Sequence, residues 1–358
     1  MLTRSTIQPR WSLWALPVLF ALAATAPLMI DPGFLNTRQA GDSPFLLFRL
    51  HQLVAALADG VFPVRWMPDG AFGLGYPFFN YYAALPYYLA ALFHALGASY
   101  VLSLKLTVVA GAIAASGGMF GWMRAITGRR SAALLAAGAY TFAPYHLVNV
   151  YLRGDSLAEF WAMSWFPVIL WALARAAEHP TRRRLAAVGL AFGALVLTHN
   201  ISALLFSPFA ALYALACVAG APGHVALPSN LLRPTRRVRL RLAALLGLAG
   251  ALGLALAAWF WVPALADQDA VQLGDQTSGY FFYGGHFRGD DLVQEGLAFD
   301  YDVFSPRANP FSMGLAQAIG IALGAGALIA RLVRRRAWAR DGAILAGLAL
   351  STWMITPS

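Results

Sequence analysis

The chain has few charged residues, a single lysine and a single cysteine. Charged side chains make up 12% of its 358 residues, about half the share that is usual in soluble domains. Cys217 lies inside an apolar run, so the chain offers neither a disulfide framework nor a thiolate metal site. The shortage of charge excludes an ordinary soluble enzyme and favours a protein with apolar surroundings.

Hydrophobic residues are abundant instead, at 59% of the chain, and they form runs long enough to cross a bilayer. The net charge of +10 comes from 25 arginines and one lysine against 16 acids. Because the arginines lie in short clusters between apolar runs, they indicate membrane topology rather than a nucleic-acid partner. We expect an all-α integral membrane protein with a single polytopic domain over residues 1–358.

The apolar runs predict about nine transmembrane helices. A further apolar run, 81–97, is not counted among them, because a crossing there would move every later arginine cluster to the other side of the membrane. We expect this run to form a re-entrant or surface-lying hairpin. The predicted spans are 11–30, 98–123, 131–150, 156–174, 185–198, 201–219, 242–263, 313–330 and 342–357.

This assignment puts 19 of the 25 arginines on the side of the N-terminus, which the positive-inside rule makes cytoplasmic. The other side carries two larger external loops, 31–97 and 264–312. We expect a multi-pass protein of the cell membrane whose first helix is not cleaved; a cleaved signal peptide is the alternative. Since the last span ends beside Ser358, the sequence also fits a chain truncated at its C-terminus.

The first external loop is predicted to contain a helix that lies along the membrane surface. Within 41–60, Asp42 or Ser43 can cap the helix and Pro44 suits its first turn, with Arg49 and His51 on a polar edge. Asp42 is therefore either a cap or a carboxylate held beside the membrane as a general base.

The next segment, 61–88, has the glycine and proline spacing of an ordered loop. Its aromatic residues fit an interfacial belt. They equally fit a site in which rings stack on a sugar and arginine pairs with phosphate. The residues expected in such a site are Arg65, Trp66, Asp69, Asn80, Tyr81 and Tyr82.

Two further polar segments are expected on the same face. Ser156 and Glu159 have the spacing of a capping box, and Asp155 adds negative charge at the same helix N-terminus, which leaves Arg153 unexplained. His199 and Asn200 interrupt an apolar stretch, as a simple turn would. The acids of the loop 264–312 match no calcium-binding spacing and indicate a solvated loop rather than a metal site.

Several motifs agree in order with a known membrane family. They are Asp42, Arg49, Gly60, Pro63, Arg65-Trp66, Pro68-Asp69, Gly73 to Pro77, Asn80-Tyr81-Tyr82, Ala143-Pro144-Tyr145, Tyr151-x-Arg153-Gly154-Asp155-x3-Glu159 and His199-Asn200. With them the chain resembles the prokaryotic "6-pyruvoyl-tetrahydropterin synthase-related" multi-pass membrane proteins. Pterin synthase activity is not expected, because the histidines are scattered over both sides of the membrane rather than grouped as in that enzyme's zinc site.

The predicted layout is also similar to the GT-C superfamily of integral-membrane glycosyltransferases, which use polyprenyl-phosphate sugars. The similarity implies that Asp42, Asp155 and Glu159 are catalytic acids. It implies a membrane lipid carrying the donor sugar, and a glycan or protein acceptor. Arg153 or Arg65 would be the partner of the carrier phosphate. The substrate-binding residues would be Arg49, His51, Arg65, Trp66, Asp69, Asn80, Tyr81, Tyr82, Arg153, His199 and Asn200.

One feature departs from that pattern: Asp42 is followed by Ser43 rather than by a second acid. A divalent cation is therefore left open, as is catalysis itself. The function expected from the sequence is a lipid-phosphate-sugar-dependent glycosyltransferase acting on the non-cytoplasmic face. The alternative is a non-enzymatic membrane protein, a flippase-like or envelope-assembly factor on the same scaffold. The chain lacks the ionisable groups that ion-coupled transporters carry at mid-membrane.

Overall fold

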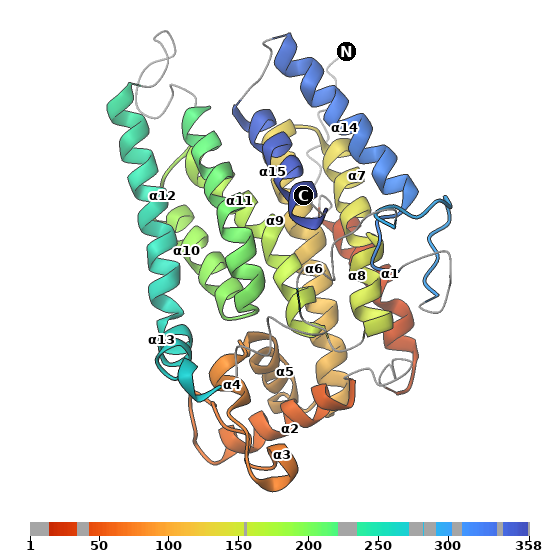
Figure 1. Ribbon diagram of the computed structural model, residues 1–358, viewed down its shortest axis with the longest axis vertical. Coiled ribbons are helices and arrows are strands. Elements are labelled where there is room, and N and C mark those ends of the chain that lie inside the picture. Colours follow the sequence, from red (N-terminus) through yellow and green to blue (C-terminus); the bar gives the residue numbers. More distant parts are fainter. Residues whose placement is uncertain are drawn as a thin grey trace, which may run out of the picture.

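A computed structural model describes residues 14–33, 43–153, 156–220, 235–271, 282, 291–302, 310–334 and 339–356. The regular secondary structure in these parts is helical apart from two isolated β-bridges, which agrees with the predicted all-α class (Figure 1). The longer helices are α1 (Ala15–Ile30), α2 (Ser43–Ala58), α6 (Tyr100–Thr127), α7 (Arg130–Thr141), α9 (Leu157–Glu178), α10 (Arg182–Val196), α11 (Asn200–Ala219), α12 (Arg236–Leu256), α14 (Leu315–Val333) and α15 (Ala339–Ile355).

Shorter helices lie between them. These are α3 (Gly70–Gly73), α4 (Phe78–Tyr81), α5 (Leu85–Ala95), α8 (Pro144–Leu147) and α13 (Ala258–Ala266), with a π-helical segment, Val148–Arg153, and a 3-10 turn, Gln268–Ala270.

Among the described residues, five helices are long and apolar enough to cross a membrane: α6, α9, α11, α12 and α14. The chain is therefore a multi-pass membrane protein. Each of the nine predicted spans overlaps a helix, but α1, α7, α10 and α15 are shorter than 18 residues. The number of crossings stays a prediction. The span predicted at 242–263 is divided at Ala257 into α12 and α13.

Small residues let the central helices pack closely. On α6, a Cβ at Gly118 would come within 2.7 Å of Val168 of α9. On α10, a Cβ at Gly193 would come within 2.8 Å of the Gly253 carbonyl of α12. Close backbone approach of this kind is how membrane helices gain van der Waals contact where lipid removes the hydrophobic driving force.

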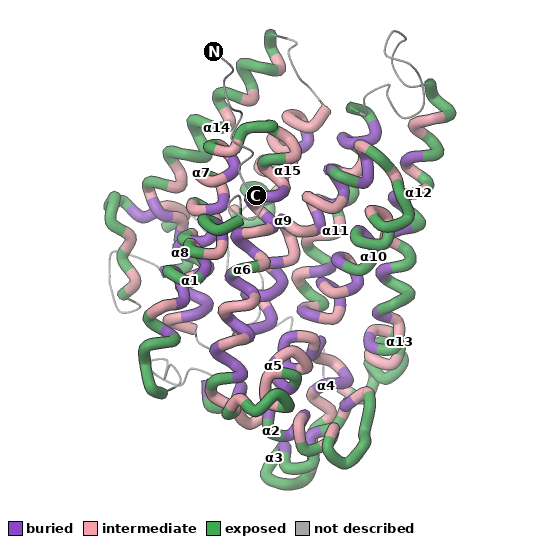
Figure 2. The backbone as a smooth tube through the Cα atoms, turned by 180° about the vertical axis from the view of Figure 1, so that it is seen from behind, coloured by how far each residue is buried: buried purple, intermediate pink, exposed green. Residues whose placement is uncertain are grey.

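Burial follows the expected position of lipid. α6 and α9 are largely buried, whereas α12 and α14 turn many exposed residues outward (Figure 2). The exposed residues of α12 include Leu240, Leu248 and Leu252. Apolar side chains on an outer face are unfavourable in water and suit the hydrocarbon of a bilayer.

The segment from α2 to α5 forms a separate layer across one end of the bundle (Figure 1). Leu46, Leu50 and Leu53 of α2 are buried, which supports the predicted surface-lying helix. The run 81–97 contains a single 11-residue helix, α5, rather than a hairpin. At about 1.5 Å per residue, α5 is too short to cross a bilayer core of about 30 Å.

The basic clusters lie at the other end of the bundle. In Figure 1, the beginnings of α12 and α15 and the end of α14 are at the top, opposite to α2 and α5. Their arginines include Arg236, Arg331 and Arg340. The structure thus separates the arginine end from the end covered by α2 to α5, as the topology predicts.

The α10–α12 contact yields a first prediction. Gly193→Leu places a side chain against the α12 backbone, and overpacking typically costs about 1–3 kcal/mol. We expect the midpoint of thermal unfolding in detergent to fall by several degrees. Gly326→Leu on α14 is the control, because a Cβ there has no heavy atom within 4 Å. Equal melting of the two variants would contradict the packing.

Candidate functional site

The Glu159 carboxylate is the centre of a polar cluster at the start of α9. Its Oε1 accepts a hydrogen bond from the Tyr145 hydroxyl at 2.6 Å. Its Oε2 accepts one from the Arg153 guanidinium, also at 2.6 Å. The Arg153 and Glu159 side chains are 34% and 24% exposed, so this ion pair is partly shielded from water.

These contacts correct the capping-box interpretation. Ser156 stands at the N-cap of α9, but its side chain makes no capping hydrogen bond. Glu159 is bound instead to Tyr145 and Arg153. Its negative charge in the first helical turn still interacts favourably with the helix dipole.

Arg153 is held from two sides. It is the last residue of the π-helical segment. This geometry is rare in proteins overall but frequent at functional sites. Its guanidinium also donates to Oδ1 of Asn149 at 3.1 Å. The Asn149 amide donates to the Tyr145 carbonyl at 2.9 Å and is almost fully buried. The arginine is therefore fixed in place rather than free to swing into solvent.

His199 joins this cluster from α11. It is the N-cap of that helix: Ser202 N–H donates to His199 Nδ1 at 3.4 Å. The predicted turn at 198–200 is therefore also a helix cap. Burial lowers the pKa of His199 below its ordinary value; nearby Glu159 raises it and Arg153 lowers it.

Aromatic rings connect His199 to the α2 helix. The Tyr82 ring lies 6.3 Å from the His199 ring, measured between centroids. Tyr82 stacks on Phe78 at 4.6 Å. The Arg49 guanidinium lies 4.4 Å above the Phe78 ring, a cation–π contact. Arg49, Tyr82, His199 and the Arg153–Glu159 pair thus make one continuous group, which we call the outer cluster.

A second group adjoins it through α4. Arg65 donates to Asn80 at 3.0 Å and to the Trp259 carbonyl at 2.5 Å. Asn80 in turn donates to an Asp267 carboxylate oxygen at 3.1 Å. These bonds tie the α2–α5 segment to α13 and to the start of the loop 264–312.

Tyr81 and Asn200 complete this connection. The Tyr81 hydroxyl donates to the Asp267 carbonyl at 2.7 Å. The Asn200 amide donates to the Tyr81 carbonyl at 3.4 Å. His199 and Asn200 therefore meet neighbouring residues at the end of α4, Tyr82 and Tyr81, so the two groups lie side by side.

Two predicted site residues, Asp69 and Trp66, hold the loop instead. The Gln52 side-chain amide donates to an Asp69 carboxylate oxygen at 2.7 Å. The Asp69 backbone N–H donates to the Gln52 side-chain oxygen at 2.9 Å. The Trp66 ring covers Gly75, where a Cβ would be 2.4 Å from the ring. His51 packs on Tyr100, away from the outer cluster.

The remaining two, Asp42 and Asp155, lie outside the described residues, so their roles stay predictions. Within the described part of the chain, no group of three or more His, Cys, Asp or Glu residues is suited to hold a metal ion. The divalent cation left open by the sequence is therefore also still a prediction.

Several residues of the two groups are not among the site residues predicted from the sequence. Asn149 with Arg153, and Phe78 with Tyr82, have a spacing of four residues, a signal that could have found them. Asp267 contacts Asn80 across 187 positions in the chain. No local pattern indicates a partner that far away. Tyr145 and Trp259 likewise join through tertiary packing alone.

Together these features define a multi-helical membrane protein with a site of arginine, acid and aromatic side chains at one end of its bundle. Residues 79–281, more than half of the chain, match the family described as "6-pyruvoyl-tetrahydropterin synthase related domain; membrane protein". The chain belongs to this family, which confirms the resemblance. No curated protein and no solved structure matches it.

The position of His199 yields a second prediction. Arg153→Gln removes a positive neighbour and should raise the His199 pKa; Glu159→Gln removes a negative one and should lower it further. NMR titration of ring-labelled protein measures both shifts, with His199→Asn identifying the resonance. A His199 pKa that is the same in both variants would show that the ring does not sense this ion pair.

Proposed function

We propose that the protein is a glycosyltransferase that takes a sugar from a polyprenyl-phosphate carrier. The observation that carries the proposal is the outer cluster, in which Arg153 and Arg49 lie in one group with stacked aromatic rings. Guanidinium groups recognise phosphate oxygens, and aromatic faces pack on sugar rings. The similarity to GT-C enzymes expected from the sequence supports the same assignment.

The site would face the non-cytoplasmic side of the cell membrane. It lies at the end of the bundle opposite to the arginine clusters, and the positive-inside rule assigns those clusters to the cytoplasm together with the N-terminus. The lipid carrier would then approach from the outer leaflet. A phosphate at the membrane surface would meet Arg153 and Arg49 while its polyprenyl chain stays in the hydrocarbon.

In this proposal Asp42 is the general base. It takes the proton from an acceptor hydroxyl as that oxygen forms a bond to the anomeric carbon. The bond between the anomeric carbon and the phosphate oxygen breaks, and the polyprenyl phosphate leaves with the electron pair. Arg153 stabilises the leaving negative charge, as a positioned cation does. Asp155 is assigned as a second acid of the same site.

Glu159 takes a supporting role. Its two oxygens are bound to Tyr145 and Arg153, so it serves best by holding the guanidinium in a fixed orientation. Fixing that group beforehand avoids part of the entropy loss on binding. Arg65, Asn80 and Tyr81 would support the acceptor side, since they connect to Asp267 at the start of the loop 264–312.

A second candidate function rests on the same contacts. Glu159 and Asp69 are both engaged by partners within the protein, as in a site that binds without reacting. On this alternative the protein is a non-enzymatic flippase-like or envelope-assembly factor that recognises the lipid phosphate. Both functions require phosphate binding, and only the first requires Asp42 as a base.

Donor binding gives the third prediction. Purified protein should bind a polyprenyl-phosphate sugar, and Arg153→Ala should raise the Kd by at least about tenfold. A hydrogen bond to a charged group contributes about 1.5–3 kcal/mol, and 1.4 kcal/mol is a factor of ten. Native mass spectrometry measures the bound fraction over a range of donor concentrations.

The matched control is Arg175→Ala, which removes an ion pair of similar length, 2.7 Å to Glu178, at the other end of α9. It should leave donor binding unchanged. Equal loss in both variants, or no binding by the parent, would overturn the proposed site.

A fourth prediction separates the two functions. Asp42→Asn should keep donor binding and lose sugar transfer by at least about a hundredfold, because a general base typically contributes 10²–10⁴-fold. The measurement is transfer from a radiolabelled donor to candidate acceptors in proteoliposomes. Full transfer by folded Asp42→Asn and Arg153→Ala would contradict the glycosyltransferase. Donor binding without transfer to any acceptor would favour the non-enzymatic function.

A further inference from the structure

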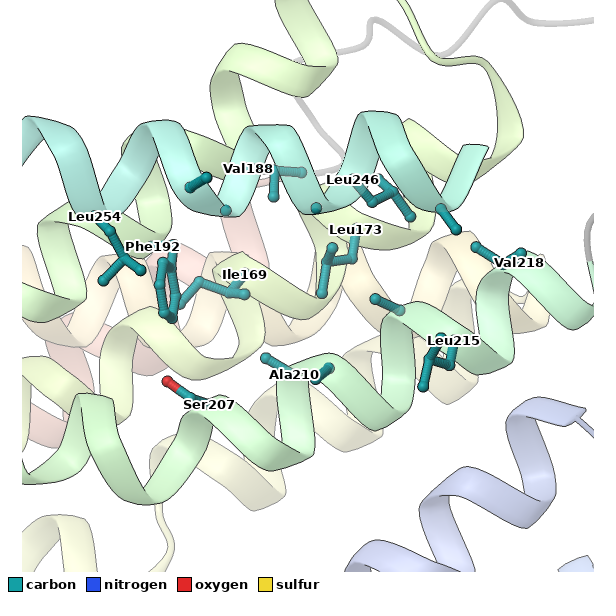
Figure 3. Close-up of a pocket in the computed structure, with 16 residues that line it drawn as sticks. Ile169, Leu173, Val188, Phe192, Ser207, Ala210, Leu215, Val218, Leu246 and Leu254 are labelled. Carbon is teal, nitrogen blue, oxygen red and sulfur yellow. The ribbon is translucent and has the colours of Figure 1, made fainter. Parts of the chain in front are cut away.

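An apolar groove runs along the outside of the helical bundle, and its described lining shares no residue with the outer cluster. It lies between α11 and α12, with α9 and α10 as its floor, and has a volume of about 530 Å³ (Figure 3). Its one polar lining side chain, Ser207, donates its hydroxyl hydrogen to the Ala203 carbonyl. Its described lining residues therefore offer no free polar side chain to a soluble ligand and suit a hydrocarbon chain.

The length of the groove matches one leaflet of a bilayer. On α12 its lining extends from Ala243 to Leu254, a rise of about 16 Å. Half of a hydrocarbon core of about 30 Å is about 15 Å. The α12 side is open because Gly247 and Gly250 have no heavy atom within 4 Å of where a Cβ would be. Glycines thus leave the space that an acyl chain would fill.

Arginines stand at the end of the groove where α12 begins. Arg239 precedes Ala243 by four residues and Arg236 precedes it by seven, so both lie on the helix face that lines the groove. Nε of Arg239 is buried and has no hydrogen-bond partner among the described residues. The positive end of the α12 dipole lies at the same place.

The charged groups near these arginines are bonded to other partners, so Arg236 and Arg239 can bind an anion from outside the protein. Arg184 of α10 donates to the Arg175 and His179 carbonyls at the end of α9. The nearby acid Glu178 is paired with Arg175 at 2.7 Å. The described residues provide no ion pair for Arg236 or Arg239.

We propose that this groove binds one acyl chain of an anionic phospholipid from the leaflet on the arginine side, with the lipid phosphate on Arg236 and Arg239. The apolar groove and the arginines together match both parts of such a lipid. This site is at the opposite end of the bundle from the outer cluster and does not depend on the proposed function.

The first test compares headgroups. Protein is reconstituted with equal amounts of phosphatidylglycerol and phosphatidylcholine of the same acyl chains, extracted, and examined by native mass spectrometry. We expect the parent protein to retain more phosphatidylglycerol than phosphatidylcholine. In an Arg236→Gln/Arg239→Gln variant the ratio of the two retained lipids should be about tenfold lower. Arg124→Gln, at the end of α6, is the control and should keep it. Equal retention of the two lipids by the parent would overturn the headgroup assignment.

The second test fills the groove. Gly250→Leu puts a side chain into the groove, whereas Gly320→Leu puts the same side chain into open space on α14. We expect Gly250→Leu to lose the retained phosphatidylglycerol and Gly320→Leu to keep it. Gly247→Leu repeats the test if the first variant melts below the parent protein. Retention of the lipid by folded groove-filled variants would contradict binding in this groove.

Discussion

A bilayer interior admits charged groups only at the ends of the helices that cross it, and this constraint organises the whole molecule. Arginines gather where α12 and α15 begin and α14 ends, whereas α2 to α5 cover the other end (Figure 1). Between the two ends, α6 and α9 pack through small residues, and the outer helices turn apolar side chains to lipid. Each end can therefore interact with anionic groups of a different leaflet.

The outer cluster forms because α9 begins where several segments meet. Its first turn supplies Glu159, which fixes Arg153 at the end of the π-helical segment. The cap of α11 brings His199 beside the same pair, and Tyr82, directly after α4, packs its ring near that of His199. No single element builds this site. Its geometry depends on the α2–α5 layer being pinned to the bundle, for example by the Leu85 N–H bond to the Leu197 carbonyl at 2.9 Å.

Local patterns in the sequence predict much of this architecture. Pro44 does lie in the first turn of α2, and the long apolar run after Ala98 does form α6. The capping box predicted at Ser156 does not form, because Tyr145 and Arg153 both donate to Glu159. The contact with Tyr145 is tertiary, so residue spacing does not reveal it. Asp69, predicted for a substrate, is used by Gln52 to fold its own loop. The bond from Arg65 to Trp259 spans 194 positions and follows only from packing.

The central claim is that the outer cluster binds the phosphate of a lipid-linked sugar. The most direct measurement is a cryo-electron microscopy structure of the protein in nanodiscs with a non-transferable polyprenyl-phosphonate sugar. We expect phosphonate density within hydrogen-bond distance of Arg153, and sugar density against Phe78 and Tyr82. Density for the donor at the arginine end of the bundle, with an unoccupied outer cluster, would contradict it.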